Sequence, residues 1–238
     1  MRSIGSGWAI GNTPIGADFA IYRWNTATRA WQQVSGQAQT LSVNLNGVPF
    51  IVNAAHEIYK WDGVSSWKLF GGGSATCGGD GPCPTSVASG SSDDETWVID
   101  KKSAVWNWNG TTWTQPTTAA GSKIMVQSTP DPVCGDHLPM VLGSSTIYAF
   151  EHSVASCVLS EGTFADTLGA GPDITTQFAM GADGKIYRWD SVLSHWSFYG
   201  ETPAGPDWGK STKIGALANG LFALSSTGAV DFMPMVPW

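Results

Sequence analysis

The sequence predicts an all-β protein, and three observations lead to that prediction. A five-residue pattern of strand-forming residues recurs along the 238 residues of the chain. Glycine is frequent, with 29 residues, and short turns that contain Gly or Asn separate the apolar segments. Aromatic residues are also frequent, and 13 of them are Trp, whereas only 13% of the residues are charged. Many turns, many aromatic side chains and few charges are typical of a chain that folds mainly into strands.

The recurring pattern indicates six units. It reads IYRWN at 21–25 and IYRWD at 186–190, and weaker copies begin at residues 58, 105, 147 and 230. The copies are 37 to 47 residues apart, which is the length of one four-stranded propeller blade. We therefore expect one domain over residues 1–238, a six-bladed β-propeller of four-stranded antiparallel blades.

The position of each strand in its blade is also predicted. We expect the pentapeptide to form the outermost strand of each blade. A second Trp follows the four best copies after a short turn, and we expect it to begin the innermost strand (Trp31, Trp67, Trp113 and Trp196). By this interpretation the N-terminal segment holds only the last three strands of a unit. Pairing of the C-terminal strand with the N-terminal blade would then close the ring and remove an exposed sheet edge.

Charge and hydropathy narrow the range of partners. The formal net charge is −7, and the 12 Lys and Arg residues are scattered. Because a nucleic-acid binder needs a basic stripe, we expect no nucleic-acid partner. No apolar segment approaches the roughly 18 residues of a membrane helix, so we expect no membrane span. The first residues lack the apolar core of a signal peptide. We expect a soluble protein, either cytoplasmic or exported by a non-classical route.

Four cysteines are candidates for disulfides: Cys77, Cys83, Cys134 and Cys157. The first two bracket the Gly-rich stretch CGGDGPC, which could close a small ring. Four cysteines allow three pairings, and the sequence does not choose among them. Free buried thiols are one alternative. A zinc site is a further alternative with weaker support, because no CxxC pair or HxxxH spacing is present. We expect no cofactor.

Catalytic motifs are missing from the sequence. The acidic residues lie mostly in turns rather than as the carboxylate pair of a glycosidase. A sialidase would show Asp boxes of the form SxDxGxxW and three converging arginines, but the chain has no such box and only four arginines. The four histidines are isolated, and there is no GxSxG, HExxH or phosphate loop. We expect no enzymatic activity.

The repeated segments resemble tectonin repeats, the units of the tectonin-type β-propeller lectins. The resemblance is carried by SIGSGWAIGN followed by IYRWN, and by GADGKIYRWD followed by a further Trp. It extends over essentially the whole chain and is weaker in two units, where Phe150 and Phe232 replace Trp. The resemblance implies multivalent binding of microbial or foreign glycans on cell surfaces, including lipopolysaccharide and O-methylated sugars, in innate defence.

The candidate sugar-binding residues stand at the end of the pentapeptide. An indole ring offers a flat apolar surface for the C–H face of a sugar, and polar neighbours could bond its hydroxyls. The candidates are Trp24, Asn25 and Arg23; Trp61 and Asp62; Trp108 and Asn109; and Trp189, Asp190 and Arg188. Packing between blades is the alternative for the Trp side chains, and turn formation is the alternative for Asn and Asp. The alternative function is a scaffold that docks proteins, and the oligomeric state is open.

Overall fold

The structure is a computed structural model of the chain. It describes residues 3–5, 7–44, 46–70, 77, 81–116, 120–126, 139–143, 147–151, 154–158, 164–170, 177–181, 185–190, 195–201, 211–217, 220–225 and 230–234. Within these ranges the regular structure is strand, apart from one 3₁₀ turn at Asp93–Glu95. The chain divides into two compact units, Met1–Ala120 and Gly121–Trp238. The single domain over residues 1–238 stays a prediction.

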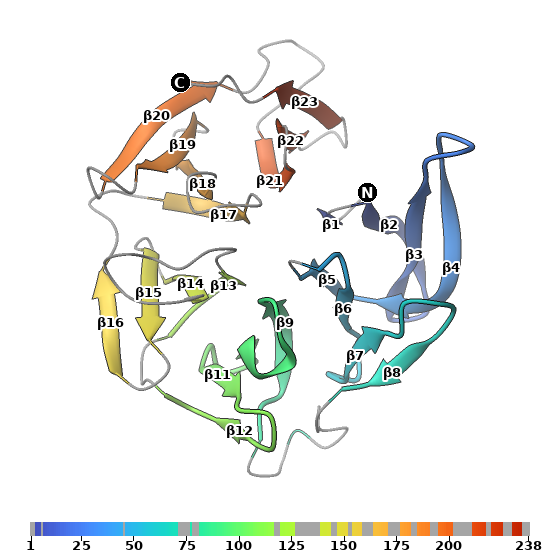
Figure 1. The fold of residues 1–238 in the computed structure, drawn as a ribbon, viewed down its shortest axis with the longest axis horizontal. Helices are drawn as coiled ribbons and strands as arrows, with labels where there is room; N and C mark the ends of the chain where they lie inside the picture. Colours follow the sequence, from blue (N-terminus) through green and yellow to red (C-terminus); the bar gives the residue numbers. More distant parts are fainter. Residues whose placement is uncertain are drawn as a thin grey trace. The chain divides into compact units, whose positions relative to one another are not determined.

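The first unit holds three four-stranded antiparallel sheets, each with its strands in chain order (Figure 1). The first sheet is β1 (Ser3–Gly5), β2 (Trp8–Ile15), β3 (Asp18–Asn25) and β4 (Ala30–Ala38). The second is β5 (Thr40–Val43), β6 (Pro49–Val52), β7 (Ile58–Trp61) and β8 (Trp67–Leu69). The third is β9 (Pro84–Ser89), β10 (Thr96–Asp100), β11 (Val105–Trp108) and β12 (Trp113–Thr114).

The second unit repeats this antiparallel arrangement. One sheet is β13 (Lys123–Val126), β14 (Pro139–Leu142), β15 (Ile147–Glu151) and β16 (Val154–Val158). The next is β17 (Phe164–Ala170), β18 (Gln177–Gly181), β19 (Lys185–Asp190) and β20 (His195–Glu201). In the described residues the last sheet has three strands, β21 (Ser211–Leu217), β22 (Gly220–Ser225) and β23 (Val230–Pro234).

The first strand of each sheet contacts its counterpart in the neighbouring sheet. In the first unit β5 contacts both β1 and β9, and in the second unit β17 contacts both β13 and β21. The fourth strand therefore forms the opposite, outer edge of each four-stranded sheet. The pentapeptide lies on the third strand, and the second Trp lies on the fourth (Figure 1). The predicted outermost and innermost positions are thus wrong, because the tight turn after the pentapeptide folds the following strand back onto the same sheet.

The N-terminal segment up to Asn25 holds three strands, as expected, but they are the first three strands of their sheet rather than the last three. Ser3–Gly5 pairs with β2 through the register Ile4 opposite Ala9, and β4 completes the sheet. At the other end, β23 pairs with β22, and residues 235–238 lie outside the described residues. Closure of a ring by the C-terminal strand stays a prediction.

The central strands of the first unit are buried on both faces. Every residue of β6 and every residue of β10 is buried. Successive side chains of a strand point to opposite faces. In β6, Ile51 accordingly packs with Ile21 of the first sheet, whereas Phe50 and Val52 pack with Val98 of the third. The apolar core of this unit therefore lies in the layers between neighbouring sheets.

A Trp side chain from the second sheet docks on the backbone of the first. Trp67 Nε1 on β8 donates a hydrogen bond of 2.8 Å to the carbonyl oxygen of Ser35 on β4. The next residue, Gly36, has a left-handed φ of 99°, and a Cβ there would lie 2.8 Å from that indole nitrogen. Gly36 is therefore required both by its backbone conformation and by the close approach of the indole ring.

This contact generates a test. We expect Gly16→Ala, at a left-handed turn position with nothing within 4 Å of the new Cβ, to lower the free energy of unfolding by about 1–2 kcal/mol. We expect Gly36→Ala to cost a further ~1–3 kcal/mol, because the methyl group overlaps Trp67. Urea unfolding followed by Trp fluorescence measures both changes. If both substitutions lowered the free energy of unfolding equally, the close approach of Trp67 would not disfavour a side chain at position 36.

Candidate functional site

A pair of Trp side chains spans the third and fourth strands of each sheet in the first unit. Trp24 lies opposite Trp31, Trp61 opposite Trp67 and Trp108 opposite Trp113. The ring centroids are 5.4, 5.1 and 5.4 Å apart, respectively, and the rings are inclined to each other. Inclined aromatic pairs stabilise by about 0.5–1.5 kcal/mol beyond burial. Each pair therefore holds together the hairpin that follows the pentapeptide.

The register extends this pairing to the second unit. Trp189 on β19 lies opposite Trp196 on β20. The side chains of Trp189 and Asp190 lie outside the described residues, so their predicted contacts with sugar stay predictions.

The three pentapeptide Trp side chains of the first unit differ in exposure. Trp24 is 38% exposed, Trp108 is half-buried and Trp61 is only 6% exposed. The ring of Trp61 is covered by Trp8, at 5.3 Å, and by Trp67. Trp61 therefore packs between sheets, as the alternative interpretation had it, and offers no face for stacking on a sugar. Trp24 alone of the three is exposed enough to serve as an open platform.

The backbone of Trp24 is held on both edges of its strand, by the turn before β2 and by β4. Its N–H donates a hydrogen bond of 2.8 Å to the carbonyl oxygen of Gly7, at the turn before β2. Its Cα pairs with that of Trp31 in β4, and the two rings stack edge to face. The exposed indole is thus fixed in position before any ligand arrives.

The Asn and Asp residues after the Trp form turns. Asn25 Oδ1 accepts hydrogen bonds from the N–H groups of Ala27 and Thr28, at 2.9 and 3.1 Å. Asn109 Oδ1 accepts in the same way from the N–H groups of Thr111 and Thr112, at 3.0 and 2.9 Å. These side-chain oxygens satisfy the turn backbone, which confirms the turn-forming alternative for both residues. The Nδ2 group of Asn25 donates to Gln32 Oε1 at 3.0 Å.

Asp62 forms the same kind of turn through a charged carboxylate group. Its Oδ1 accepts from the N–H groups of three consecutive residues (Val64, Ser65 and Ser66), and its Oδ2 accepts from Ser66 Oγ at 2.5 Å. These donors, with the Ser66 hydroxyl first, hold the pKa of Asp62 well below its ordinary value of 3.8. The carboxylate therefore stays charged and fully engaged in its own turn.

Basic residues at the middle of the pentapeptide face aromatic rings of the second strand. Arg23 pairs in register with Trp8, and its guanidinium carbon lies 5.5 Å from the ring centroid. Lys60 pairs likewise with Phe50, with its Nζ 5.7 Å from the ring centroid. In the second unit, half-buried Arg188 lies opposite Phe178 in register. Sequence reasoning assigned Arg23 and Arg188 to sugar but missed these cross-strand partners. The Arg23–Trp8 and Lys60–Phe50 pairs stabilise the sheets through cation–π attraction.

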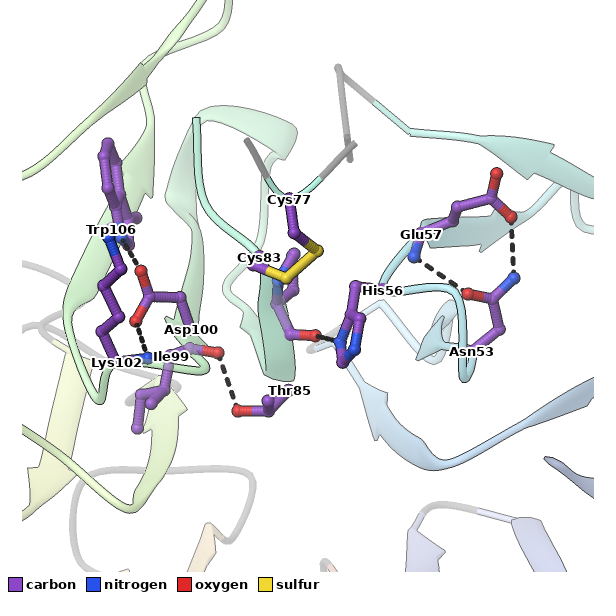
Figure 2. The surroundings of a disulfide bond; sticks show 11 residues. Asn53, His56, Glu57, Cys77, Cys83, Thr85, Ile99, Asp100, Lys102 and Trp106 are labelled. Atoms are coloured by element: carbon purple, nitrogen blue, oxygen red, sulfur yellow. Dashed lines mark hydrogen bonds between the residues drawn. A yellow bond between two sulfur atoms is a disulfide. The ribbon is translucent and has the colours of Figure 1, made fainter. Parts of the chain in front are cut away.

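A half-buried polar contact joins Tyr59 to an acidic residue that sequence reasoning did not single out. Tyr59 Oη donates to Glu57 Oε2 at 3.0 Å, and Asn53 Nδ2 donates to the same oxygen at 2.8 Å (Figure 2 shows Glu57 with Asn53). Burial, with the hydrogen bond and negative charge of Glu57, raises the pKa of Tyr59. Tyr59 also packs against the core between the first and second sheets.

Cys77 and Cys83 form a disulfide, which confirms the small ring (Figure 2). Cys157 lies on β16, but its side chain and the whole of Cys134 lie outside the described residues. The state of these two cysteines therefore stays open. Among the described residues, no helix has the length and hydropathy to cross a membrane.

Comparison with known proteins shows the fold. No family model and no curated protein matches the chain. Solved structures similar to it include virginiamycin B lyase from Staphylococcus aureus, at 12% identity and a TM-score of 0.58 over 97% of this chain and 85% of that one. The Myceliophteria thermophila Cps50 (Swd1) β-propeller domain gives 10% identity and a TM-score of 0.58, covering 99% of this chain and 98% of that one.

The RRP9 WD40 repeats are also similar, at 10% identity and a TM-score of 0.57 over 92% of this chain and 73% of that one. The fold of the chain is a β-propeller. At such low identity the similarity does not extend to function.

The charged turn at Asp62 predicts a pH dependence. Because the pKa of Asp62 is lower in the folded than in the unfolded protein, its ionisation stabilises the fold above the ordinary value of 3.8. That stabilisation is lost as the pH falls from there through the lower folded pKa. We expect Asp62→Asn, which keeps one acceptor oxygen, to be less stable than the natural protein at about pH 6, with the difference shrinking progressively as the pH falls below 3.8.

Urea midpoints across this pH range measure the effect. Asn109→Asp provides the reciprocal control, because it places a carboxylate in the matching turn of the third sheet. We expect this variant to acquire a similar pH dependence. A stability difference between Asp62→Asn and the natural protein that is constant with pH would contradict the assignment.

Proposed function

We propose that the protein is a non-enzymatic carbohydrate-binding propeller of the tectonin type. In this proposal the six sheets are the blades of one closed ring. Support comes from the pentapeptide on the third strand of every sheet, from the β-propeller fold and from the exposed, pre-positioned Trp24. The exposure of Trp24 is the observation that carries the proposal.

The proposed site is the outer end of the β3–β4 hairpin. Trp24 provides the apolar platform, and Trp31 supports it from the neighbouring strand. Asn25 Nδ2 donates to Gln32 Oε1, so the second N–H of Asn25 and both N–H groups of Gln32 remain to serve ligand hydroxyls. Because successive side chains of a strand point to opposite faces, these amides lie on the other face of the sheet from the Trp24 ring and would serve only a ligand that reaches around the hairpin end.

The same features suggest a class of ligand. An O-methyl group removes a hydroxyl donor and adds an apolar surface that is driven out of water onto an indole ring. Methylated microbial glycans and lipopolysaccharide sugars on a dense cell surface therefore suit this site. Half-buried Trp108, and Trp189 of the second unit, are the candidates for further sites of the same kind, and linked sites raise avidity by about 10²–10⁴.

A glycan array with matched variants tests the proposal. We expect Trp24→Ala to weaken binding to methylated or microbial glycans by roughly tenfold, because about 1.4 kcal/mol of stacking is lost. Leu69→Ala is the control, since Leu69 is 58% exposed and belongs to β8 of the second sheet rather than to the β3–β4 hairpin. It should leave glycan binding unchanged. Absence of binding to every methylated or microbial glycan would refute the lectin proposal.

A protein-docking scaffold is the second candidate function. The exposed apolar side chains of Val64, which is 80% exposed in the β7–β8 turn, and of Leu69 favour it. The same two variants separate the functions. A scaffold would capture a protein partner that free sugar does not displace. Leu69→Ala should lose this partner, and Trp24→Ala should retain it.

A further inference from the structure

A histidine from one sheet lies against the disulfide that precedes the next. The Cys77 and Cys83 sulfurs and a ring nitrogen of His56 all lie within 4.8 Å of one another. His56 belongs to the turn between β6 and β7, whereas Cys83 directly precedes β9 (Figure 2). Three side chains that are typical ligands of soft metal ions therefore meet at the junction of the second and third sheets.

The imidazole of His56 is oriented as a metal ligand would be. Its Nδ1 lies 2.7 Å from the carbonyl oxygen of Pro84. Because a carbonyl can only accept, Nδ1 carries the proton and Nε2 keeps its lone pair. Metal-binding histidines commonly donate their other ring N–H to a backbone carbonyl in this way, which fixes both the tautomer and the ring direction.

The backbone of His56 supports this orientation. The residue has a left-handed φ of 63°, which His, like Asn and Asp, adopts more readily than most residues other than Gly, and Ser103 has a similar φ of 64°. The N–H of His56 donates to the carbonyl oxygen of Asn53 at 3.0 Å, and Asn53 is itself bonded to Glu57. A polar turn thus holds the imidazole at the cysteine pair at some cost in backbone strain.

We propose that the reduced protein binds a thiophilic divalent cation such as Zn²⁺ through Cys77, Cys83 and His56 Nε2, and that the disulfide closes this site. Reduction by a dithiol breaks the S–S bond: two electrons and two protons pass to the cysteines, and the dithiol becomes a disulfide. Binding of Zn²⁺ then displaces the two thiol protons. Two thiolates and a neutral imidazole make an uncharged complex, with a water molecule as fourth ligand.

The distances allow this exchange with little movement. Tetrahedral Zn²⁺ with bonds of about 2.3 Å to sulfur and ~2.0 Å to nitrogen places its ligand atoms roughly 3.5–3.8 Å apart. The two sulfurs and a ring nitrogen of His56 already lie within 4.8 Å of one another, so the main change on metal binding is separation of the two sulfurs. Cys77 is exposed, so an ion can reach its sulfur from solvent.

The experiment titrates the full-length protein with Co²⁺, a spectroscopic substitute for Zn²⁺, with and without a phosphine reductant. We expect one equivalent bound only after reduction, with the charge-transfer and d–d bands of tetrahedral cobalt–thiolate. Zn²⁺ should bleach these bands. No uptake by the reduced protein, or equal uptake by the oxidised protein, would overturn the proposal.

Substitutions assign the ligands. His56→Asn removes Nε2 while a left-handed backbone remains acceptable, and Cys77→Ser alters an exposed position. Each should raise the Kd for Co²⁺ by at least tenfold in protein whose circular dichroism is unchanged. Cys134→Ser and Cys157→Ser are the controls and should leave the Kd unchanged. Loss of binding in these controls, with binding retained in His56→Asn, would place the metal elsewhere and overturn the assignment.

Discussion

Burial of both faces of each sheet is the constraint on which the rest of the first unit depends. A strand such as β6, buried throughout, must present apolar side chains in both directions, with Ile51 toward one neighbour and Phe50 toward the other. Adjacent sheets meet along their first strands, so the outer strands require larger groups to fill the space between them. Trp67 does so, and its indole nitrogen bonds the backbone of the preceding sheet.

This constraint explains most of the pentapeptide without a ligand. In IYRWN, Ile21 is buried in the core, Arg23 covers the Trp8 ring, Trp24 pairs with Trp31, and Asn25 closes the turn. Each position satisfies a local requirement of a two-sided strand followed by a tight hairpin. Recurrence of the pattern is therefore evidence of architecture. Function would be sought where a repeated side chain keeps an open face beyond its architectural role, and Trp24, which is 38% exposed, is such a position.

The sequence was sufficient for the strand content, the repeat length and the turns, because these depend on local periodicity and on Asn or Gly at fixed positions. It was insufficient for the order of strands within a sheet. The same hairpin spacing fits a second Trp on either the innermost or the outer strand, and only pairing of Trp31 with Trp24 decides between them. Exposure could not be predicted either: Trp24 and Trp61 share one pattern, but only Trp61 is covered by Trp8, which comes from a distant part of the sequence.

Differences in exposure also limit how a lectin of this architecture could work. A multivalent surface gains avidity from the number of equivalent platforms, yet Trp61 is withdrawn into the core and Trp108 is half-buried. With fewer open sites, each must contribute more affinity of its own. The charged groups near the platforms are already engaged, Arg23 with Trp8 and Asp62 with its turn. In the proposed lectin, recognition at Trp24 would therefore rest mainly on apolar stacking, which favours sugars that carry methyl groups over strongly charged ones.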